Sequence, residues 1–200
     1  QGLPLVAIPT TAGSGSQATH FAVVYVDNHK YSLAHQYLLP SYVIVEPLLS
    51  YKASKKVAAS SAMDALCQAI ESYWSLSATQ ESQNYALDAI KLILTSIDLA
   101  VNGKDEKAMN TMSLAAHLSG KAINITKTTA PHAMSYILTS NFKISHGHAV
   151  ASLLGPVAKI SFNRGNDKFK TVLNEIFKLF DCESINEFYK IWNKLMKSCG

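Results

Sequence analysis

Asp64 and Gln68 form the first pair whose types and spacing point to chemistry. They stand four residues apart in a stretch with a helical period, so both side chains lie on one helix face, one turn apart. A carboxylate and an amide in this arrangement can hold one small ion or one substrate, although such a pair more often belongs to a solvated face. Their neighbours are nearly all apolar, and a carboxylate among apolar residues needs a partner.

Two histidines, His132 and His146, follow fourteen residues apart. A helix and a turn between them would let their rings converge. Neutral imidazoles suit borderline transition metals, a carboxylate completes such a site, and an amide oxygen is a weaker fourth ligand. Histidine pairs at long spacing are also common by chance, so the spacing alone leaves open a metal site and two unrelated histidines. His148 is interpreted as either a neighbour of that site or an exposed residue.

Lys127 lies in the segment 126–129, Thr-Lys-Thr-Thr, just ahead of His132. Two interpretations are open. The segment is an ordinary surface lysine with a helix-capping cluster, or it supplies a cation and hydroxyls for a substrate phosphate or phosphonate beside His132. Cys67 has no base placed for it, so we expect a small buried hydrophobe rather than a nucleophile.

The segment 10–16, TTAGSGS, follows an apolar run at 3–8 that we expect to form a buried strand. Small residues with two glycines let backbone amides approach an anion closely, which makes this segment a candidate phosphate or cofactor loop. Further strands are expected at 21–26 and 42–45.

From Ser54 onward the apolar residues recur at three- and four-residue steps, which predicts helices. Asn102-Gly103 is expected to end one of them, and the spacing of Ser184 and Glu187 fits a capping box at the start of the last. The expected helices span residues 54–74, 80–100, 105–123, 131–138, 148–160, 167–180 and 185–197. The sequence therefore predicts a mostly α protein after a small β-containing N-terminal part.

Composition excludes several classes of protein. Of 200 residues 48% are hydrophobic and 16% charged, so the chain can bury a core and is not disordered. The net charge of +4 comes from scattered lysines, so we expect no nucleic-acid partner. Three widely spaced cysteines, no signal-peptide pattern and no apolar run long enough for a membrane span lead us to expect a cytoplasmic protein.

Four motifs in register resemble the iron-containing (group III) alcohol dehydrogenase family. They are residues 8–16 (IPTTAGSGS), 63–71 (MDALCQAIE), 132–136 (HAMSY) and 146–149 (HGHA). The resemblance implies the helical C-terminal domain of a dehydroquinate synthase-like fold, preceded by a small α/β remnant of the nucleotide-binding domain. Residues 1–50 would end the cofactor domain, and residues 51–200 would form the helical metal and substrate domain, incomplete at its C-terminus. The chain would then be a fragment, inactive by itself.

The resemblance also assigns residues to roles. It implies that Asp64, His132 and His146 are metal ligands for iron or zinc. The residues that it places beside NAD or NADP are Thr10, Thr11, Gly13, Ser14 and Lys30. Two positions depart from the family: Gln68 replaces a histidine ligand, and Tyr136 replaces another histidine. Glutamine offers only a neutral oxygen, so weaker metal binding is expected.

The implied reaction is hydride transfer between NAD(P)H and an aldehyde carbonyl that a divalent metal polarises. Lys127 would bind the substrate, and Tyr136 or His148 would pass a proton to the alkoxide. The departures and the Lys127 segment resemble the branch that reduces phosphonoacetaldehyde to 2-hydroxyethylphosphonate. The alternatives are a glycerol-dehydrogenase-like or other alcohol dehydrogenase, a lyase of the same fold, and a helical module with a degenerate binding site or a plain structural role. The full-length form is expected to be a homodimer that acts on a small aldehyde or alcohol.

Overall fold

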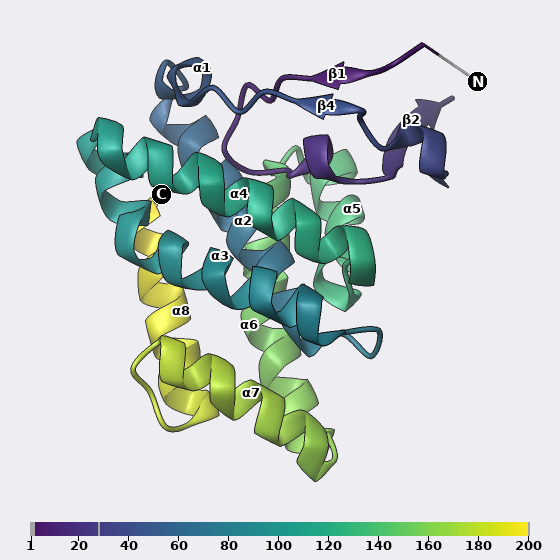
Figure 1. The fold of residues 1–200 in the computed structure, drawn as a ribbon. Helices are drawn as coiled ribbons and strands as arrows, with labels where there is room; N and C mark the ends of the chain where they lie inside the picture. The colour runs from purple at the N-terminus through teal and green to yellow at the C-terminus, as the bar shows by residue number, and fades with distance from the viewer. Residues whose placement is uncertain (1–2, 28, 200) are drawn as a thin grey trace.

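The computed structural model describes residues 3–27 and 29–199. The strands lie along the top of the helical body in Figure 1, and α7 lies at the opposite end. The helices are α1 (Pro47–Tyr51), α2 (Lys55–Trp74), α3 (Gln80–Asp98), α4 (Glu106–Thr126), α5 (Ala130–Phe142), α6 (His146–Arg164), α7 (Asp167–Leu179) and α8 (Ile185–Cys199). The predicted mostly α fold is confirmed, and no helix among the described residues is long and apolar enough to cross a membrane.

Helix α2 is the centre of the helical body. It contacts α3, α4 and α6, and every residue from 62 to 74 is buried. A helix that is buried on all sides has no solvated face on which to place polar side chains. The polar side chains of Asp64, Gln68 and Glu71 must therefore find partners inside the protein.

The helix starts agree with the sequence. The side chain of Ser54 accepts a hydrogen bond from the N–H of Val57 at the start of α2, and Asp105 accepts one from Ala108 at the start of α4. Asn102-Gly103 ends α3 through a π-helical turn at Leu99–Gly103. Helices α5 and α6 are longer than predicted, because α5 continues to Phe142 and α6 already begins at His146.

The N-terminal part holds short strands. Strand β1 (Val6–Ala7) pairs in parallel with β4 (Tyr42–Val43), and β2 (Phe21–Val26) pairs antiparallel with β3 (His29–Ala34). Strand β3 was not predicted, since its apolar pattern is weak. The expectation of a buried strand at 3–8 is wrong: Val6 is 49% exposed and Ile8 50%. Among the described residues β1 pairs only with β4. The division of the chain at residue 50 stays a prediction.

The glycines of the 10–16 segment have a packing role that the sequence did not reveal. A Cβ on Gly13 would lie 2.6 Å from Ser61 Cβ on α2. Gly15 has a φ of +61°, and its Cβ would lie 2.5 Å from the Cα of Gly120 on α4. The segment therefore rests directly on the helix backbones, which only residues without a Cβ permit.

Substitution of Gly120 tests this contact. In Gly120→Ala the added Cβ would lie 2.4 Å from the carbonyl oxygen of Gly15, so the loop must move. We expect a loss of about 1–3 kcal/mol in the free energy of unfolding, measured by chemical denaturation. The control is Gly103→Ala, whose new Cβ would have its nearest neighbour at 3.7 Å and which should stay within about 0.5 kcal/mol of the unmodified chain. Equal effects of the two substitutions would contradict the packing role.

Candidate metal centre

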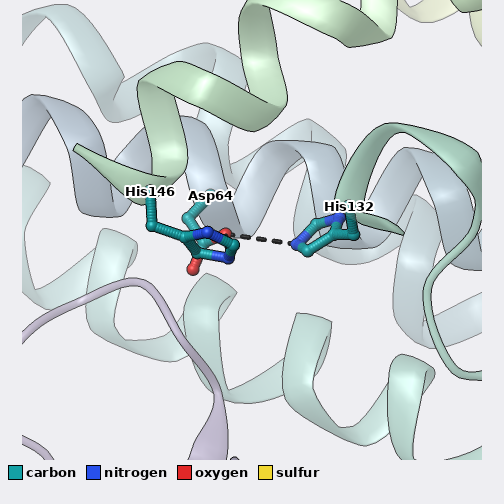
Figure 2. A group of neighbouring side chains, drawn as sticks. All are labelled: Asp64, His132 and His146. Atoms are coloured by element: carbon teal, nitrogen blue, oxygen red, sulfur yellow. Dashed lines mark hydrogen bonds and ion pairs between the residues drawn. The ribbon is translucent and has the colours of Figure 1, made fainter. Parts of the chain in front are cut away.

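Asp64, His132 and His146 come from three helices and converge on one point (Figure 2). Asp64 Oδ1 lies 3.3 Å from His132 Nε2 and 3.6 Å from His146 Nε2. One possible ligand atom from each residue lies within 4.8 Å of the others. Asp64 and His132 are buried, while His146 is partly exposed. One carboxylate and two imidazoles at this separation fit a single divalent transition metal ion.

The start of α6 is held against α2 by a glycine. A Cβ on Gly147 would lie 1.8 Å from the carbonyl oxygen of Ser60, so any other residue would push the two helices apart. The N–H of Gly147 also donates to Ser60 Oγ at 3.2 Å. This close approach places His146, one residue earlier, beside Asp64.

The orientation of His132 depends on Glu71, a residue to which the sequence analysis gave no role. The Glu71 side chain is fully buried, and its Oε1 lies 2.5 Å from His132 Nδ1. Its Oε2 accepts from the N–H and the hydroxyl of Thr129, at 2.5 and 2.8 Å. With a proton on Nδ1 shared with Glu71, the ring presents Nε2 to Asp64.

The pKa of His132 is set by burial and by the two neighbouring carboxylates. Burial by itself would lower the pKa, but hydrogen bonds with Asp64 and Glu71 outweigh burial and raise it to about 9. Glu71 follows Asp64 by seven residues, two helical turns, so both carboxylates lie on one face of α2. That spacing was the only signal in the sequence, and it does not distinguish a positioning residue from a solvated one.

Gln68 lies on the same face of α2, between the two carboxylates. Its Nε2 donates to Asp64 Oδ2 at 3.1 Å and to the carbonyl oxygen of Ser14 at 3.2 Å. Its Oε1 lies 3.1 Å from Ser119 Oγ on α4. The sequence analysis expected the amide oxygen of Gln68 to be a weak fourth metal ligand. In this structure that oxygen faces Ser119, whereas the amide nitrogen faces Asp64, so metal binding by Gln68 stays a prediction.

A cavity of about 840 Å³ opens over these residues. The candidate site residues that line it are Ser14, Asp64, Gln68, Lys127, Thr128, His132, Tyr136 and His146. Strands β2 and β3 supply further wall residues, among them Phe21, Val23 and Ser32. One cavity therefore contains the metal-ligand cluster, a lysine, a phenol and part of the candidate cofactor loop.

The segment 126–129 divides between the cavity and the core. Thr126 Oγ1 donates within the interior, at 2.9 Å from Ser72 Oγ. Thr129 Oγ1 accepts from Trp74 Nε1 at 2.9 Å and donates to Glu71. Only Lys127 and Thr128 line the cavity, so fewer hydroxyls face a substrate than the sequence indicated.

The backbone of Lys127 is strained. Its φ of 62° and ψ of 179° fall in a region that is populated almost entirely by glycine. The N–H of Lys127 still donates to the carbonyl oxygen of Ile123 at 2.7 Å, and Thr126 Oγ1 lies 2.9 Å from the Lys127 carbonyl oxygen. The surrounding structure holds a costly conformation at a residue that lines the cavity, which is typical of functional sites.

Tyr136 and His148 differ in position. The Tyr136 ring lies parallel to the His146 ring, at 1° between planes and 6.2 Å between centroids, and it lines the cavity. His148 lines a separate pocket with Lys55 and Lys143, and its Nδ1 lies 2.8 Å from Ser145 Oγ. Residues two apart on a helix are rotated by about 200° around its axis and lie on nearly opposite faces. Helix α6 therefore cannot direct both His146 and His148 at Asp64.

The predicted cofactor-loop residues do not all face the cavity. Ser14 lines it, Gly13 packs on α2, Thr11 lines a narrow gap beside Ala12, and Thr10 is exposed. The side chain of Lys30, in β3, lies outside the described residues. Their contact with a nucleotide stays a prediction.

Cys67 is the small buried hydrophobe that the sequence predicted. Its side chain is 0% exposed, and burial raises the pKa of its thiol well above the usual range, with Glu71 and Asp64 adding to the shift. A thiol in this environment is not a nucleophile.

Comparison with known proteins points to one family. Residues 58–200 match the model of the Fe-containing alcohol dehydrogenase family, C-terminal, and residues 1–47 match that of iron-containing alcohol dehydrogenase. Long-chain-alcohol dehydrogenase 1 of Geobacillus thermodenitrificans is 38% identical over 155 residues, 77% of this chain and 39% of that protein. Phosphonoacetaldehyde reductase of Streptomyces viridochromogenes is 37% identical over 154 residues, 76% of this chain and 39% of that protein.

A solved structure agrees over the whole chain. Sulfoacetaldehyde reductase from Bifidobacterium kashiwanohense, in complex with NAD+, superposes with a TM-score of 0.92 at 31% identity. The match covers 100% of this chain and 53% of that chain. This chain thus spans about two fifths of the length of the two curated relatives and about half of the solved structure.

Replacement of Glu71 tests whether its hydrogen bond orients His132 for metal binding. In Glu71→Gln the amide NH2 group must face either the N–H of Thr129 or the protonated Nδ1 of His132, so one of these two buried contacts is lost without a large change in volume. We expect the affinity for Zn²⁺ to fall by about 10- to 100-fold, measured by competition with a chromogenic chelator. The matched control is Glu175→Gln, which removes the carboxylate that pairs with the Tyr73 hydroxyl away from the site and should leave zinc affinity unchanged. Zinc affinity retained in Glu71→Gln would refute the assignment.

Proposed function

This chain belongs to the iron-containing alcohol dehydrogenase family, and from this premise we propose that it supplies the metal and substrate site of an enzyme that reduces an aldehyde to a primary alcohol with NAD(P)H. The observation that carries the proposal is the convergence of Asp64, His132 and His146 in a cavity that also contains Lys127 and Tyr136. The long-chain-alcohol and sulfoacetaldehyde enzymes are relatives of this chain in sequence and fold, and they support the reaction class.

The donor set fits iron or zinc. Asp64 Oδ1 and the Nε2 atoms of His132 and His146 would hold the ion, which when bound supplies Lewis-acid polarisation of the substrate carbonyl. Ser14 and the glycine-containing loop would contact the nicotinamide cofactor, the source of the hydride. Glu71 keeps His132 Nε2 directed at the cavity throughout.

Reduction of a carbonyl needs one hydride at carbon and one proton at oxygen. Tyr136 is the proton donor that we assign, because its ring lines the cavity beside His146 while His148 lines another pocket. The phenol hydroxyl can donate its proton to the alkoxide oxygen and recover it from solvent.

The substrate that we propose is an aldehyde with an anionic head group, such as phosphonoacetaldehyde. Two relatives, a phosphonoacetaldehyde reductase and a sulfoacetaldehyde reductase, are named for such substrates. In this chain the strained Lys127 and the hydroxyl of Thr128 line the cavity and can bind an anion with charge-assisted hydrogen bonds. A cytoplasmic location and a homodimer stay predictions.

Lys127→Ala tests the anionic substrate. In the complete protein, we expect the KM for phosphonoacetaldehyde to rise by about 10- to 100-fold, the loss of one hydrogen bond to a charged group, with little change for propionaldehyde. The matched control is Lys143→Ala, which removes another lysine of positive φ (58°), outside this cavity. Equal effects on both aldehydes would rule out the anionic substrate and favour a neutral-alcohol dehydrogenase.

Asp64→Asn tests the reaction itself. In the complete protein, we expect bound iron or zinc, measured by elemental analysis, to fall sharply. The oxidation of NADH or NADPH should drop by at least about 1000-fold, because several kcal/mol of charge stabilisation is lost. Asp88→Asn, at an exposed position on α3, should retain both. Full turnover in Asp64→Asn would refute the metal assignment. No turnover of any aldehyde by the unmodified, metal-loaded protein would favour a binding module without catalysis.

A further inference from the structure

The two oxygens of the Asp64 carboxylate have different partners. Oδ1 faces His132 and His146, at 3.3 and 3.6 Å. Oδ2 accepts from Gln68 Nε2 at 3.1 Å. The carboxylate therefore presents one oxygen to the candidate metal position, while the other is fixed by the amide.

The orientation of the Gln68 amide is set by its neighbours. Its Nε2 faces two acceptors, Asp64 Oδ2 and the carbonyl oxygen of Ser14, and its Oε1 faces the hydroxyl of Ser119. A flipped amide would place an oxygen against both acceptors and lose two hydrogen bonds in a buried site, where Gln68 is only 4% exposed. The amide oxygen thus faces α4, and the two amide hydrogens link the loop to Asp64.

Ser14 links the loop surface that faces the cavity to the Gln68 amide behind it. Gly13 and Gly15, on either side of it, contact the backbones of α2 and α4. The Ser14 side chain is exposed and lines the cavity, while its carbonyl oxygen accepts from Gln68. A ligand that contacts the loop therefore acts on the same peptide unit that anchors the amide.

We propose that Gln68 is a positioning residue that couples nucleotide binding at the loop to metal binding at Asp64. The inference rests on the proposed function, because it assumes that both ligands bind where that proposal places them. Each of the two Nε2 hydrogens has one acceptor, so fixing the Ser14 carbonyl also fixes the amide and, through it, the Asp64 carboxylate. Nucleotide binding should then favour metal binding, and by linkage the metal should favour the nucleotide equally.

The experiment is a pair of calorimetric titrations of the complete protein with Zn²⁺, without and with saturating NADH. In the unmodified protein we expect NADH to lower the zinc Kd by about fivefold or more. In Gln68→Met, which keeps the side-chain volume and removes both hydrogen-bonding groups, the ratio of the two Kd values should fall to within about twofold of one. Gln83→Met makes the same chemical change on α3, away from the cavity, and should keep the full ratio.

The outcomes separate this inference from the proposed function. If Gln68 were an independent metal ligand, Gln68→Met would weaken zinc binding with and without NADH and leave the ratio unchanged, which overturns the coupling. An unmodified protein that binds neither zinc nor NADH overturns the proposed function as well. A second measurement needs no variant: zinc alone should slow hydrogen exchange of the amides at residues 12–17, and unchanged exchange there would also overturn the proposal.

Discussion

The rest of the site depends on the contacts of two buried carboxylates, those of Asp64 and Glu71, with His132. Asp64 and Glu71 stand two turns apart on α2 and reach opposite nitrogens of one imidazole, at 3.3 and 2.5 Å. Two negative charges in the interior are costly unless each is paired and hydrogen-bonded. His132 of α5 is their shared partner; Glu71 also accepts from the N–H and hydroxyl of Thr129, and Asp64 also accepts from Gln68 and lies near His146. These contacts fix the start of α5, and with it the position of His132, against the two carboxylates of α2.

Helices were predictable because their signals are local. Ser54 and Asp105 cap helices where the sequence placed their starts, and the apolar period located every helix from α2 to α8. The strands were harder, because a strand is defined by its partner. The run at residues 3–8 has the composition of a buried strand, yet burial depends on elements packed against it, which composition does not reveal. Strand β3 became evident only through its pairing with β2.

The candidate ligands could be proposed from residue types and from the family resemblance, but their surroundings could not. Glu71 looks in sequence like any acidic residue on a helix, and only its burial against His132 reveals its place. His148 was interpreted as a neighbour of the site or an exposed residue, and the direction of α6 places it in a different pocket from His146. The loop glycines were predicted to let backbone amides approach an anion, and their contacts with Ser61 and Gly120 could not be predicted. In each case the residue's role depends on which neighbour its side chain or backbone faces. The order of residues in the sequence does not determine this.

One wall of the cavity consists of helices and the opposite wall of the β2–β3 hairpin. The candidate ligands come from helices packed into the core, whereas Phe21, Val23 and Ser32 of the opposite wall belong to the β2–β3 hairpin, whose residues are largely exposed. Replacing exposed hairpin side chains such as Val23 should cost this chain little stability, because surface changes away from special contacts usually do. New substrate preferences can therefore arise by drift in the hairpin while the reactive centre is inherited intact.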